Sequence, residues 1–283
     1  MRLVSFQAED GPAAAVLLGE DLVPVATLGA PATTVRGLLA ACDAATLREL
    51  QMRAEQEDER IALAGVTLHP PVTDPQKIVC LGLNYRDHAE ETGQDIPATP
   101  MWFAKFANSL VGSGQDIVLP GAHAGYVDYE AELALVIGRP ARNVDAKDAL
   151  AHIAGAMPFN DVSARDLQLQ NPLWTSGKAI DTFAPCGPAL VTLDEIEDLQ
   201  DLGLRTRING EQLQQGSTAN LIFGPAEVLA WLSRTMTLLP GDIIATGTPA
   251  GVGAAQGRFL KDGDTVEVEI DGLGTLVNLV RSE

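Results

Sequence analysis

The hydrophobic and polar positions of the first 70 residues predict three short strands and two helices. Strand-type segments cover residues 2–6, 14–18 and 22–25, with Gly and acidic turns between them. Helical spacing covers residues 34–41 and 44–63. The segment that follows, His69–Pro75, holds three prolines and cannot be helical, so it predicts a boundary. We expect a small N-terminal α/β module over residues 1–70, acting as a structural cap, and a main domain over residues 71–283.

The main domain is predicted to be mostly β, which gives an α+β fold class overall. Apolar runs typical of buried strands occur at 77–83 and 133–137. Asn209-Gly210 and Asp271-Gly272 each stand between strand-type segments and predict β-hairpins. The remaining signals are a helix over 223–236, an alternating strand within 100–110, a short amphipathic helix over 145–151, and a strand leading into a Gly-rich loop over 239–253.

Two carboxylates stand on one face of the strand predicted over residues 127–138. Side chains of a strand alternate between faces, so Glu130 and Glu132 project together at the mouth of an apolar run. Such a pair is costly there unless a cation or donor lies between the two groups. Asp161 supplies a third carboxylate behind the run Ile153–Met157. Without a nearby Cys or His, this set predicts a Mg²⁺ or Mn²⁺ site and not a Zn²⁺ site.

A group of ionisable residues follows the strand of residues 77–83. If residues 85–91 form a helical turn, His88 and Glu91 share one face, and the carboxylate orients the imidazole as a general base requires. The alternative is a solvated surface pair, which the spacing taken alone favours. The next segment, 93–100, has the composition of a flexible loop, so the pair is a candidate for a mobile lid.

Two lysines need an interpretation of their own. Lys105 stands among aromatic residues, and we interpret it as a side chain at the edge of the core whose amine reaches solvent. Lys178 follows Gly177 in a segment, 174–178, predicted to be a loop. It is a candidate contact to a substrate or a metal-bound water, although a lone lysine in a loop is more often solvated.

Composition narrows the class of protein. The 283 residues carry a net charge of −19, with 46% apolar and 20% charged residues, as in ordinary soluble proteins. Without a basic stripe we expect no nucleic-acid partner, and the acidity itself serves solubility. An anionic substrate would need a local cation. Three separated cysteines, no signal pattern and no apolar run of membrane-spanning length predict a cytoplasmic protein with no membrane partner.

From Lys77 to the C-terminus the chain resembles the fumarylacetoacetate hydrolase family. The segments that carry the resemblance are Leu81–His88, Asp128–Leu133, Asn160–Asp166, Gly177-Lys178 and Pro240–Pro249. The resemblance implies a mixed β-sandwich roll and a homodimer. It also implies that Glu130, Glu132 and Asp161 bind Mg²⁺ or Mn²⁺, with Ca²⁺ as a substitute.

The resemblance assigns further roles. It implies that His88 and Glu91 form the catalytic pair of a lid and that Lys178 is the lysine of the metal site. It also implies substrate contacts from the loop after the strand of residues 239–246 and from three further polar residues: Thr246, Gly247, Thr248, Arg86, Arg165 and Gln168.

Our leading hypothesis is metal-dependent hydrolysis of a C–C bond in a small anionic 2,4-diketo acid, such as an acylpyruvate, fumarylpyruvate or a diketo-deoxy sugar acid, in catabolism. The cation would chelate the 2-oxo acid end while His88 activates water. The same site would serve oxaloacetate decarboxylation, or isomerisation or decarboxylation of an unsaturated oxo-diacid. A non-catalytic binder of metal or ligand, or a structural Ca²⁺ site, is the alternative from another class.

Overall fold

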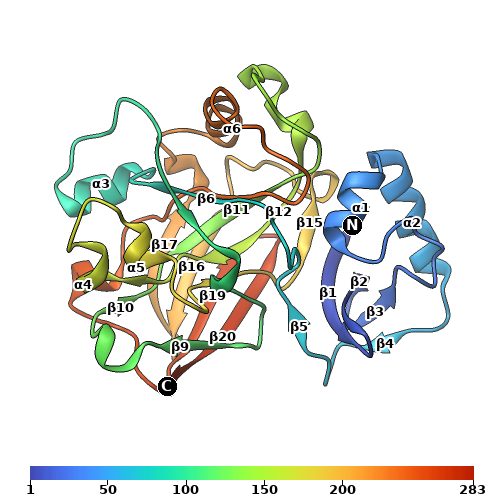
Figure 1. The fold of residues 1–283 in the computed structure, drawn as a ribbon, viewed down its shortest axis with the longest axis horizontal. Coiled ribbons are helices and arrows are strands. Elements are labelled where there is room, and N and C mark those ends of the chain that lie inside the picture. The colour runs from blue at the N-terminus through green and yellow to red at the C-terminus, as the bar shows by residue number, and fades with distance from the viewer.

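The computed structural model describes residues 1–283 and consists of two large β-sheets with short helices around them (Figure 1). The larger sheet has eleven strands. In spatial order they are β4 (Ile61–Ala62), β3 (Asp21–Pro24), β2 (Gly11–Leu18), β1 (Arg2–Ala8), β15 (Leu190–Thr192), β12 (Ile153–Asn160), β11 (Ala131–Ile137), β18 (Ile243–Ala245), β6 (Ile78–Gly82) and β7 (Met101–Lys105), with β5 (Leu68–His69) paired to β1.

The second sheet has five strands and packs against the middle of the first. Its order is β17 (Glu211–Ser217), β16 (Gly203–Ile208), β19 (Thr265–Ile270), β20 (Gly274–Ser282) and β9 (Asp116–Leu119). Strand β11 shows why the two sheets form a sandwich. Leu133 and Leu135 enter the core between the sheets, while Ala134 and Val136 face the opposite core beneath the N-terminal helices. A strand apolar on both faces is therefore buried on both faces, as the continuous apolar run predicted.

The helices are short and lie outside the sheets. They are α1 (Val35–Ala41), α2 (Ala44–Gln56), α3 (Arg86–Thr92), α4 (Arg165–Gln168), α5 (Thr175–Lys178), α6 (Pro225–Ser233) and α7 (Gly253–Gln256), with a 3₁₀ segment at Ala146–His152. Two small two-stranded pieces, β10 (Val127–Asp128) with β13 (Ser163–Ala164) and β8 (Leu110–Val111) with β14 (Ala184–Pro185), join the connections between them. None of the helices combines the length and apolar character needed to cross a bilayer.

The N-terminal module is joined to the rest of the protein by backbone pairing. Strand β1 pairs with β15 through Leu3 and Leu190, so one sheet runs through both parts (Figure 1, blue strands beside β15). The predicted helix over 44–63 is too long, because α2 ends at Gln56. Ile61 belongs to strand β4 and pairs with Leu22 of β3. The charged run between them offers no apolar face that could extend the helix. A domain boundary at residue 70 stays a prediction.

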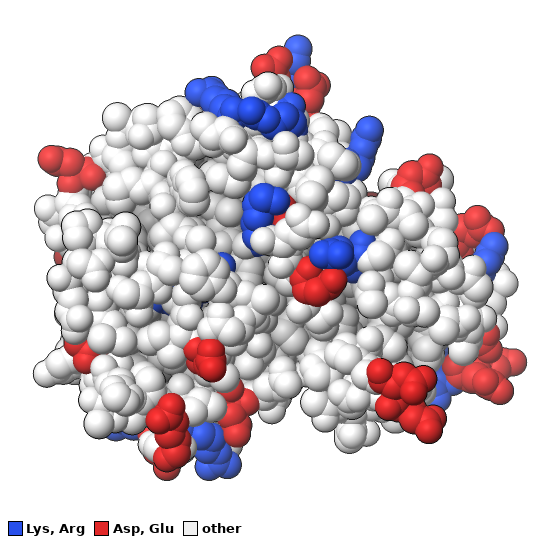
Figure 2. Space-filling view, in the orientation of Figure 1, with Lys and Arg blue, Asp and Glu red and all other residues white.

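The predicted β-rich C-terminal third is confirmed. Strands β16 and β17 form the hairpin around Asn209-Gly210, and β19 and β20 form the one through Asp271-Gly272. The helix predicted over 223–236 is α6, which begins at Pro225. Acidic side chains are scattered around the edge of the face shown, at the top, at the upper left, along the lower edge and over the N-terminal module, and a few Lys and Arg lie near its centre beside an acidic group (Figure 2). On this face the acidity is spread out, as expected of solvated charge.

Candidate active site

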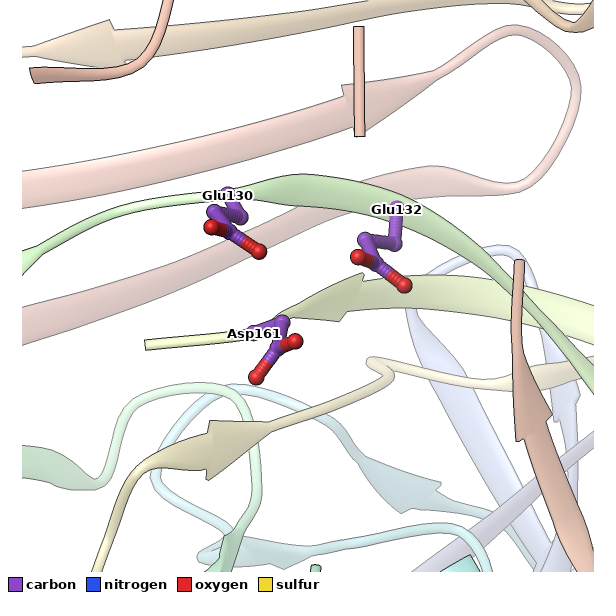
Figure 3. A group of neighbouring side chains, drawn as sticks. All are labelled: Glu130, Glu132 and Asp161. Carbon is purple, nitrogen blue, oxygen red and sulfur yellow. The ribbon is translucent and has the colours of Figure 1, made fainter. Parts of the chain in front are cut away.

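The three predicted metal ligands converge where β11 and β12 lie side by side. Glu130 immediately precedes β11, Glu132 belongs to it, and Asp161 immediately follows β12. The antiparallel register pairs Ala131 with Asn160, which brings the three acidic residues together. One carboxylate oxygen from each lies within 4.8 Å of the others, and all three residues are buried (Figure 3). Spacing along a strand and pairing between strands therefore build the cluster jointly.

Glu132 is the member of the cluster with the fewest partners. Its Oε2 accepts a hydrogen bond from the Gly247 amide at 2.9 Å, while Oε1 is buried and has no partner. Burial, together with the charges of Asp161 and Glu130, raises the pKa of Glu132 well above its usual value. Gly247 has a φ of +98°, which explains why the backbone amide that faces Glu132 belongs to a glycine.

Glu130 and Asp161 are held by cations. Lys178 Nζ donates to Glu130 Oε2 at 2.7 Å and to Asp161 Oδ2 at 2.8 Å. Arg165 Nη2 lies 2.6 Å from Glu130 Oε1 and 2.8 Å from Asp128 Oδ2. Burial alone would raise the pKa of Glu130, but Lys178 and Arg165 outweigh it and hold that pKa below its usual value. Lys178 shows the converse: burial lowers its pKa, and Asp161 and Glu130 raise it beyond its usual range.

Lys178 is not in a loop as predicted, because residues 175–178 form the short helix α5. Its Gly177 explains the close packing: a Cβ there would lie 2.4 Å from the Gln168 amide nitrogen and 2.6 Å from the Ala164 carbonyl oxygen. Only a glycine allows α5 to approach α4 this closely, and the approach directs Lys178 into the cluster. The Lys178 ammonium also stands 5.0 Å from the centre of the Phe103 ring.

The interpretation of Lys105 as a solvent-reaching side chain at the edge of the core is wrong. Its side chain has no exposed surface, and Nζ lies 2.7 Å from Asp161 Oδ1. The ammonium donates hydrogen bonds to the carbonyl oxygens of Val162, Lys178 and Phe183. An ammonium buried this deeply needs a paired charge and acceptors for all three protons, and here it has both.

His88 and Glu91 are brought together by α3, as predicted from their spacing. His88 Nδ1 lies 3.1 Å from Glu91 Oε2, and Glu91 Oε1 accepts a hydrogen bond from the Gly251 amide at 2.8 Å. Their side chains are 14% and 20% exposed, so the pair is only partly solvated. Because Glu91 accepts from Nδ1, Nε2 of His88 is left as the free ring nitrogen.

A cavity of about 340 Å³ connects the two groups. The acidic cluster contributes Glu130, Glu132 and Lys178 to its lining, and α3 contributes His88 and Glu91. The rest of the lining has more apolar than polar residues: Leu81, Gly82, Leu83, Phe103, Leu169, Trp174, Val252, Ala254, Ala255, Thr92, Gln94, Arg165, Gln168 and Thr248. A larger cavity of about 700 Å³ between α2 and β12 holds none of the predicted site residues. The cavity of about 340 Å³ is therefore the one lined by the ionisable residues of the predicted site.

Of the other residues predicted to contact the substrate, some line the cavity and others lie outside it. Thr248 and Gln168 line the cavity, although Thr248 Oγ1 also accepts a hydrogen bond from Gln214. Thr246 donates its hydroxyl to the Leu133 carbonyl oxygen and does not line the cavity. Arg86 is exposed, donates to the Leu221 carbonyl oxygen and lies outside it as well.

Sequence reasoning missed two residues that support the cluster. Asp128 accepts hydrogen bonds from the amides of Gly253 and Ala254 and pairs with Arg165, which in turn pairs with Glu130. Asp128 stands two residues before Glu130, so the strand alternation that identified Glu132 was a usable signal for it. Lys105 had no such signal, since only the fold shows what surrounds its amine.

The cluster suits a hard divalent cation. Glu132 Oε1 is buried and has no partner, whereas Asp161 Oδ1 lies 2.7 Å from the Lys105 ammonium. A buried carboxylate oxygen without a donor, in a set of three carboxylates, is what Mg²⁺, Mn²⁺ or Ca²⁺ would satisfy. The repulsion that raises the pKa of Glu132 is the same repulsion that such a cation would relieve.

Comparison with known proteins decides the family. The model of the fumarylacetoacetate (FAA) hydrolase C-terminal domain matches residues 77–281. The chain belongs to the fumarylacetoacetate hydrolase family. The solved structure of fumarylacetoacetate hydrolase from Exiguobacterium antarcticum, 33% identical, superposes over the full length of both chains with a TM-score of 0.87. The fold expected from the resemblance is thereby confirmed.

Among curated relatives of this family member, the names point to oxaloacetate. Human oxaloacetate tautomerase FAHD2A, mitochondrial, is 46% identical over 219 residues, 76% of this chain and 69% of its own length. Oxaloacetate tautomerase fahd2, mitochondrial, of Xenopus laevis is 38% identical over 99% of this chain and 90% of its own. These names favour the oxaloacetate and isomerase alternatives over hydrolysis of a diketo acid. Both proteins are mitochondrial, so a cytoplasmic location stays a prediction.

Solved structures of the family cover two chemistries. The 2-hydroxyhepta-2,4-diene-1,7-dioate isomerase of Mycobacterium marinum is 38% identical, with a TM-score of 0.78 over 100% of this chain and 99% of its own. Maleylpyruvate hydrolase of Sphingobium sp. SYK-6, in complex with manganese(II) ion and pyruvate, is 32% identical, with a TM-score of 0.83 over 100% and 99%. The relatives are enzymes, and one binds a divalent cation with a 2-oxo acid.

Proposed function

We propose that this protein is a divalent-metal-dependent enzyme that interconverts the keto and enol forms of oxaloacetate or of a closely related 2-oxo acid. The observation that carries the proposal is one cavity lined both by Glu130 and Glu132, which form an acidic cluster with Asp161, and by the His88–Glu91 pair. The names of the two oxaloacetate tautomerases support the choice of substrate.

His88 is the group that moves the proton. In the tautomer that donates Nδ1–H to Glu91, Nε2 carries a lone pair and acts as base toward carbon 3 of the keto acid. The C–H electron pair becomes the double bond between carbons 2 and 3, and the carbonyl pair moves onto the 2-oxygen, which gives the enolate. The imidazolium then gives its proton to the 2-oxygen to form the enol. In the reverse direction His88 takes the proton of the enol O–H and returns it to carbon 3, which restores the keto form. Glu91 stabilises the imidazolium that exists between the two transfers, and the Gly251 amide holds Glu91 in place.

Lys178 has one proton available for the substrate. Its ammonium has three, of which Glu130 and Asp161 accept two. The third is free to stabilise negative charge that develops on the 2-oxygen, as donors aimed at developing charge do in other enzymes. Phe103 and Trp174 line the same cavity and reduce the water around this exchange.

Glu130, Glu132 and Asp161 are the residues that would hold Mg²⁺ or Mn²⁺. When bound, the cation supplies Lewis-acid polarisation of the 2-oxo group and offsets the charge of an anionic substrate. Seven ionisable groups meet at the site: Asp128, Glu130, Glu132, Asp161, Lys105, Lys178 and Arg165. With all four acids ionised the group has an excess of one negative charge, so an added divalent cation makes it receptive to an anion.

Hydrolysis of a 2,4-diketo acid is the second candidate. The His88–Glu91 pair would serve equally to deprotonate a water molecule that attacks the distal carbonyl. The maleylpyruvate hydrolase complex with manganese(II) ion and pyruvate supports this reading. Decarboxylation of oxaloacetate shares the enolate and needs no water. The homodimer implied by family resemblance also stays a prediction, which light scattering would check.

The test follows the ultraviolet absorbance of enol-oxaloacetate with the purified protein and Mn²⁺. Malate dehydrogenase with NADH reports keto-oxaloacetate, and lactate dehydrogenase with NADH reports pyruvate. If the protein is a tautomerase, the enol should decay faster and the keto form should appear faster than with Mn²⁺ alone. The amount of pyruvate formed should not exceed that formed with Mn²⁺ alone. Pyruvate from oxaloacetate would indicate a decarboxylase. Pyruvate from acetylpyruvate or maleylpyruvate, with no effect on oxaloacetate, would make the protein a hydrolase.

A further inference from the structure

Lys105 is a buried cation that the proposed reaction does not use. It lies at the end of β7, and its ammonium contacts three other parts of the chain. These contacts are the Asp161 carboxylate with the adjoining Val162 carbonyl, the Lys178 carbonyl at the end of α5, and the Phe183 carbonyl before β14. One side chain therefore joins the segments that carry a predicted metal ligand and the predicted metal-site lysine.

We propose that Lys105 is a positioning residue that fixes Asp161 and Lys178 in the geometry the cation site requires. It fixes Asp161 through Oδ1 at 2.7 Å, so that Oδ2 is left to Lys178. It fixes Lys178 through the carbonyl oxygen of that residue, so the backbone and the side chain of Lys178 are both anchored next to Asp161. The inference rests on the proposed metal site, and it assigns Lys105 no contact with the substrate.

Because Lys105 is buried, displacing the groups that its ammonium contacts would be costly. The side chain is fully buried, and each proton of its ammonium goes to a different carbonyl oxygen. Moving Asp161, Val162 or α5 would leave a buried charge or a buried acceptor without its partner, which is costly in a low-dielectric interior. Groups that orient metal ligands from behind typically change metal affinity or activity by roughly 10- to 100-fold when they are removed.

The charge of Lys105 and its positioning role predict opposite changes in Mn²⁺ affinity when Lys105 is replaced. A positive charge 2.7 Å from a carboxylate oxygen repels a divalent cation, so removal of that charge without other change would tighten metal binding. Positioning predicts weaker binding, because Asp161 and α5 would lose their anchor. The sign of the change in Mn²⁺ affinity therefore separates the two roles.

The experiment compares Lys105→Met, Lys105→Gln and the control Lys77→Met with the wild type. Lys77 also pairs its ammonium with a buried carboxylate, Asp242, at 3.0 Å. It lies next to Ile78, the residue of β6 that faces Lys105, but it does not line the cavity or contact the acidic cluster. Mn²⁺ affinity is measured by calorimetry, and the symmetry of the bound ion by electron paramagnetic resonance. Amide hydrogen exchange is measured on the metal-free proteins. Lys105→Gln keeps two donors and covers the case in which Lys105→Met does not fold.

We expect the Lys105 variants to bind Mn²⁺ roughly 10- to 100-fold more weakly, with an altered resonance spectrum. Exchange should be faster at residues 161–164 and 178–184, while Lys77→Met should change neither the affinity nor the spectrum. Unchanged or tighter Mn²⁺ binding in a folded Lys105 variant would overturn the proposal. If the wild type bound no Mn²⁺, the proposed function would fail, and hydrogen exchange would decide for Lys105: a local increase at those segments supports positioning, and a uniform one overturns it.

Discussion

The two walls of the cavity are built differently. The acidic wall belongs to β11, β12 and the buried lysines, and its carboxylates are 0–7% exposed. The other wall is the seven-residue helix α3, whose His88 and Glu91 are 14% and 20% exposed. Glu91 reaches the rest of the protein through one amide hydrogen bond, from Gly251. A cation site needs ligands that are held in fixed positions. A helix that carries a general base can open to admit substrate more easily if few contacts hold it.

The largest expected effect comes from the acidic wall. Glu132→Gln removes the carboxylate whose Oε1 has no partner, so metal binding should weaken by well over tenfold and metal-dependent turnover should fall to background. Because the change also removes the buried charge repelled by Asp161 and Glu130, the metal-free variant should melt no lower than the metal-free wild type. Calorimetry with Mn²⁺ and thermal melts in chelator measure both. A variant that lost metal binding only because it had unfolded would contradict this.

Replacing the base should separate the walls. His88→Ala is expected to lower the turnover number by roughly 10²- to 10⁴-fold, the usual contribution of a general base. Its Mn²⁺ affinity should stay close to that of the wild type, because the partner of the His88 ring is Glu91 and not one of the three clustered carboxylates. His123→Ala, on a short 3₁₀ turn that is not part of the cavity, is the control. Unchanged turnover in His88→Ala would remove histidine from the mechanism.

The partner of the base should matter less than the base itself. Glu91→Gln retains a group that can accept from His88 Nδ1 but loses the charge that stabilises the imidazolium. Hydrogen bonds to charged groups contribute about 1.5–3 kcal/mol, so a loss of roughly 10- to 100-fold in turnover is expected, with metal affinity unchanged. Steady-state kinetics at saturating Mn²⁺ measures it. A loss as large as that of His88→Ala would mean that Glu91 acts directly on the substrate.

Metal affinity should rise with pH, because a proton competes with the cation for Glu132. The pKa of this residue in the metal-free protein is raised, so the proton stays on through pH values at which an ordinary carboxyl, with a pKa near 4.5, has lost it. The sign for stability is the reverse: the metal-free protein should lose stability as pH rises through the raised pKa. Calorimetric titrations of the wild type across this range measure the affinity. Thermal melts in chelator, with Glu132→Gln as the control that lacks this titration, measure the stability. Affinity that falls with rising pH would contradict it.

The smallest effect is predicted for Arg86. Its guanidinium is exposed and donates to the Leu221 carbonyl oxygen outside the cavity. Arg86→Ala should therefore change the specificity constant by less than about threefold, the range of ordinary surface substitutions. A much larger loss would show that α3 moves on substrate binding and brings Arg86 inside, which would make this wall more mobile than its bonds suggest.

Most strands and the acidic cluster were predictable from local pattern. Alternation placed Glu130 and Glu132 on one face, and the apolar run before Asp161 placed that residue at a strand end. The contact between His88 and Glu91 followed from helical spacing once residues 85–91 formed a helix, whereas their place in a site came from the family resemblance. Lys105 could not be predicted, because its burial depends on α5 and residues 161–183, far away in sequence. The choice among tautomerase, decarboxylase and hydrolase was also out of reach, since all three use the same residues.

Anomalous diffraction from crystals soaked with Mn²⁺ would test the central claim most directly, namely that the acidic wall holds a divalent cation in front of His88. The account predicts one strong peak per chain, at coordination distance from Glu130, Glu132 and Asp161 and on the side of the cavity that faces His88. A peak elsewhere, or none at saturating Mn²⁺, would contradict the account, because the buried Glu132 oxygen that has no partner would then serve some other purpose.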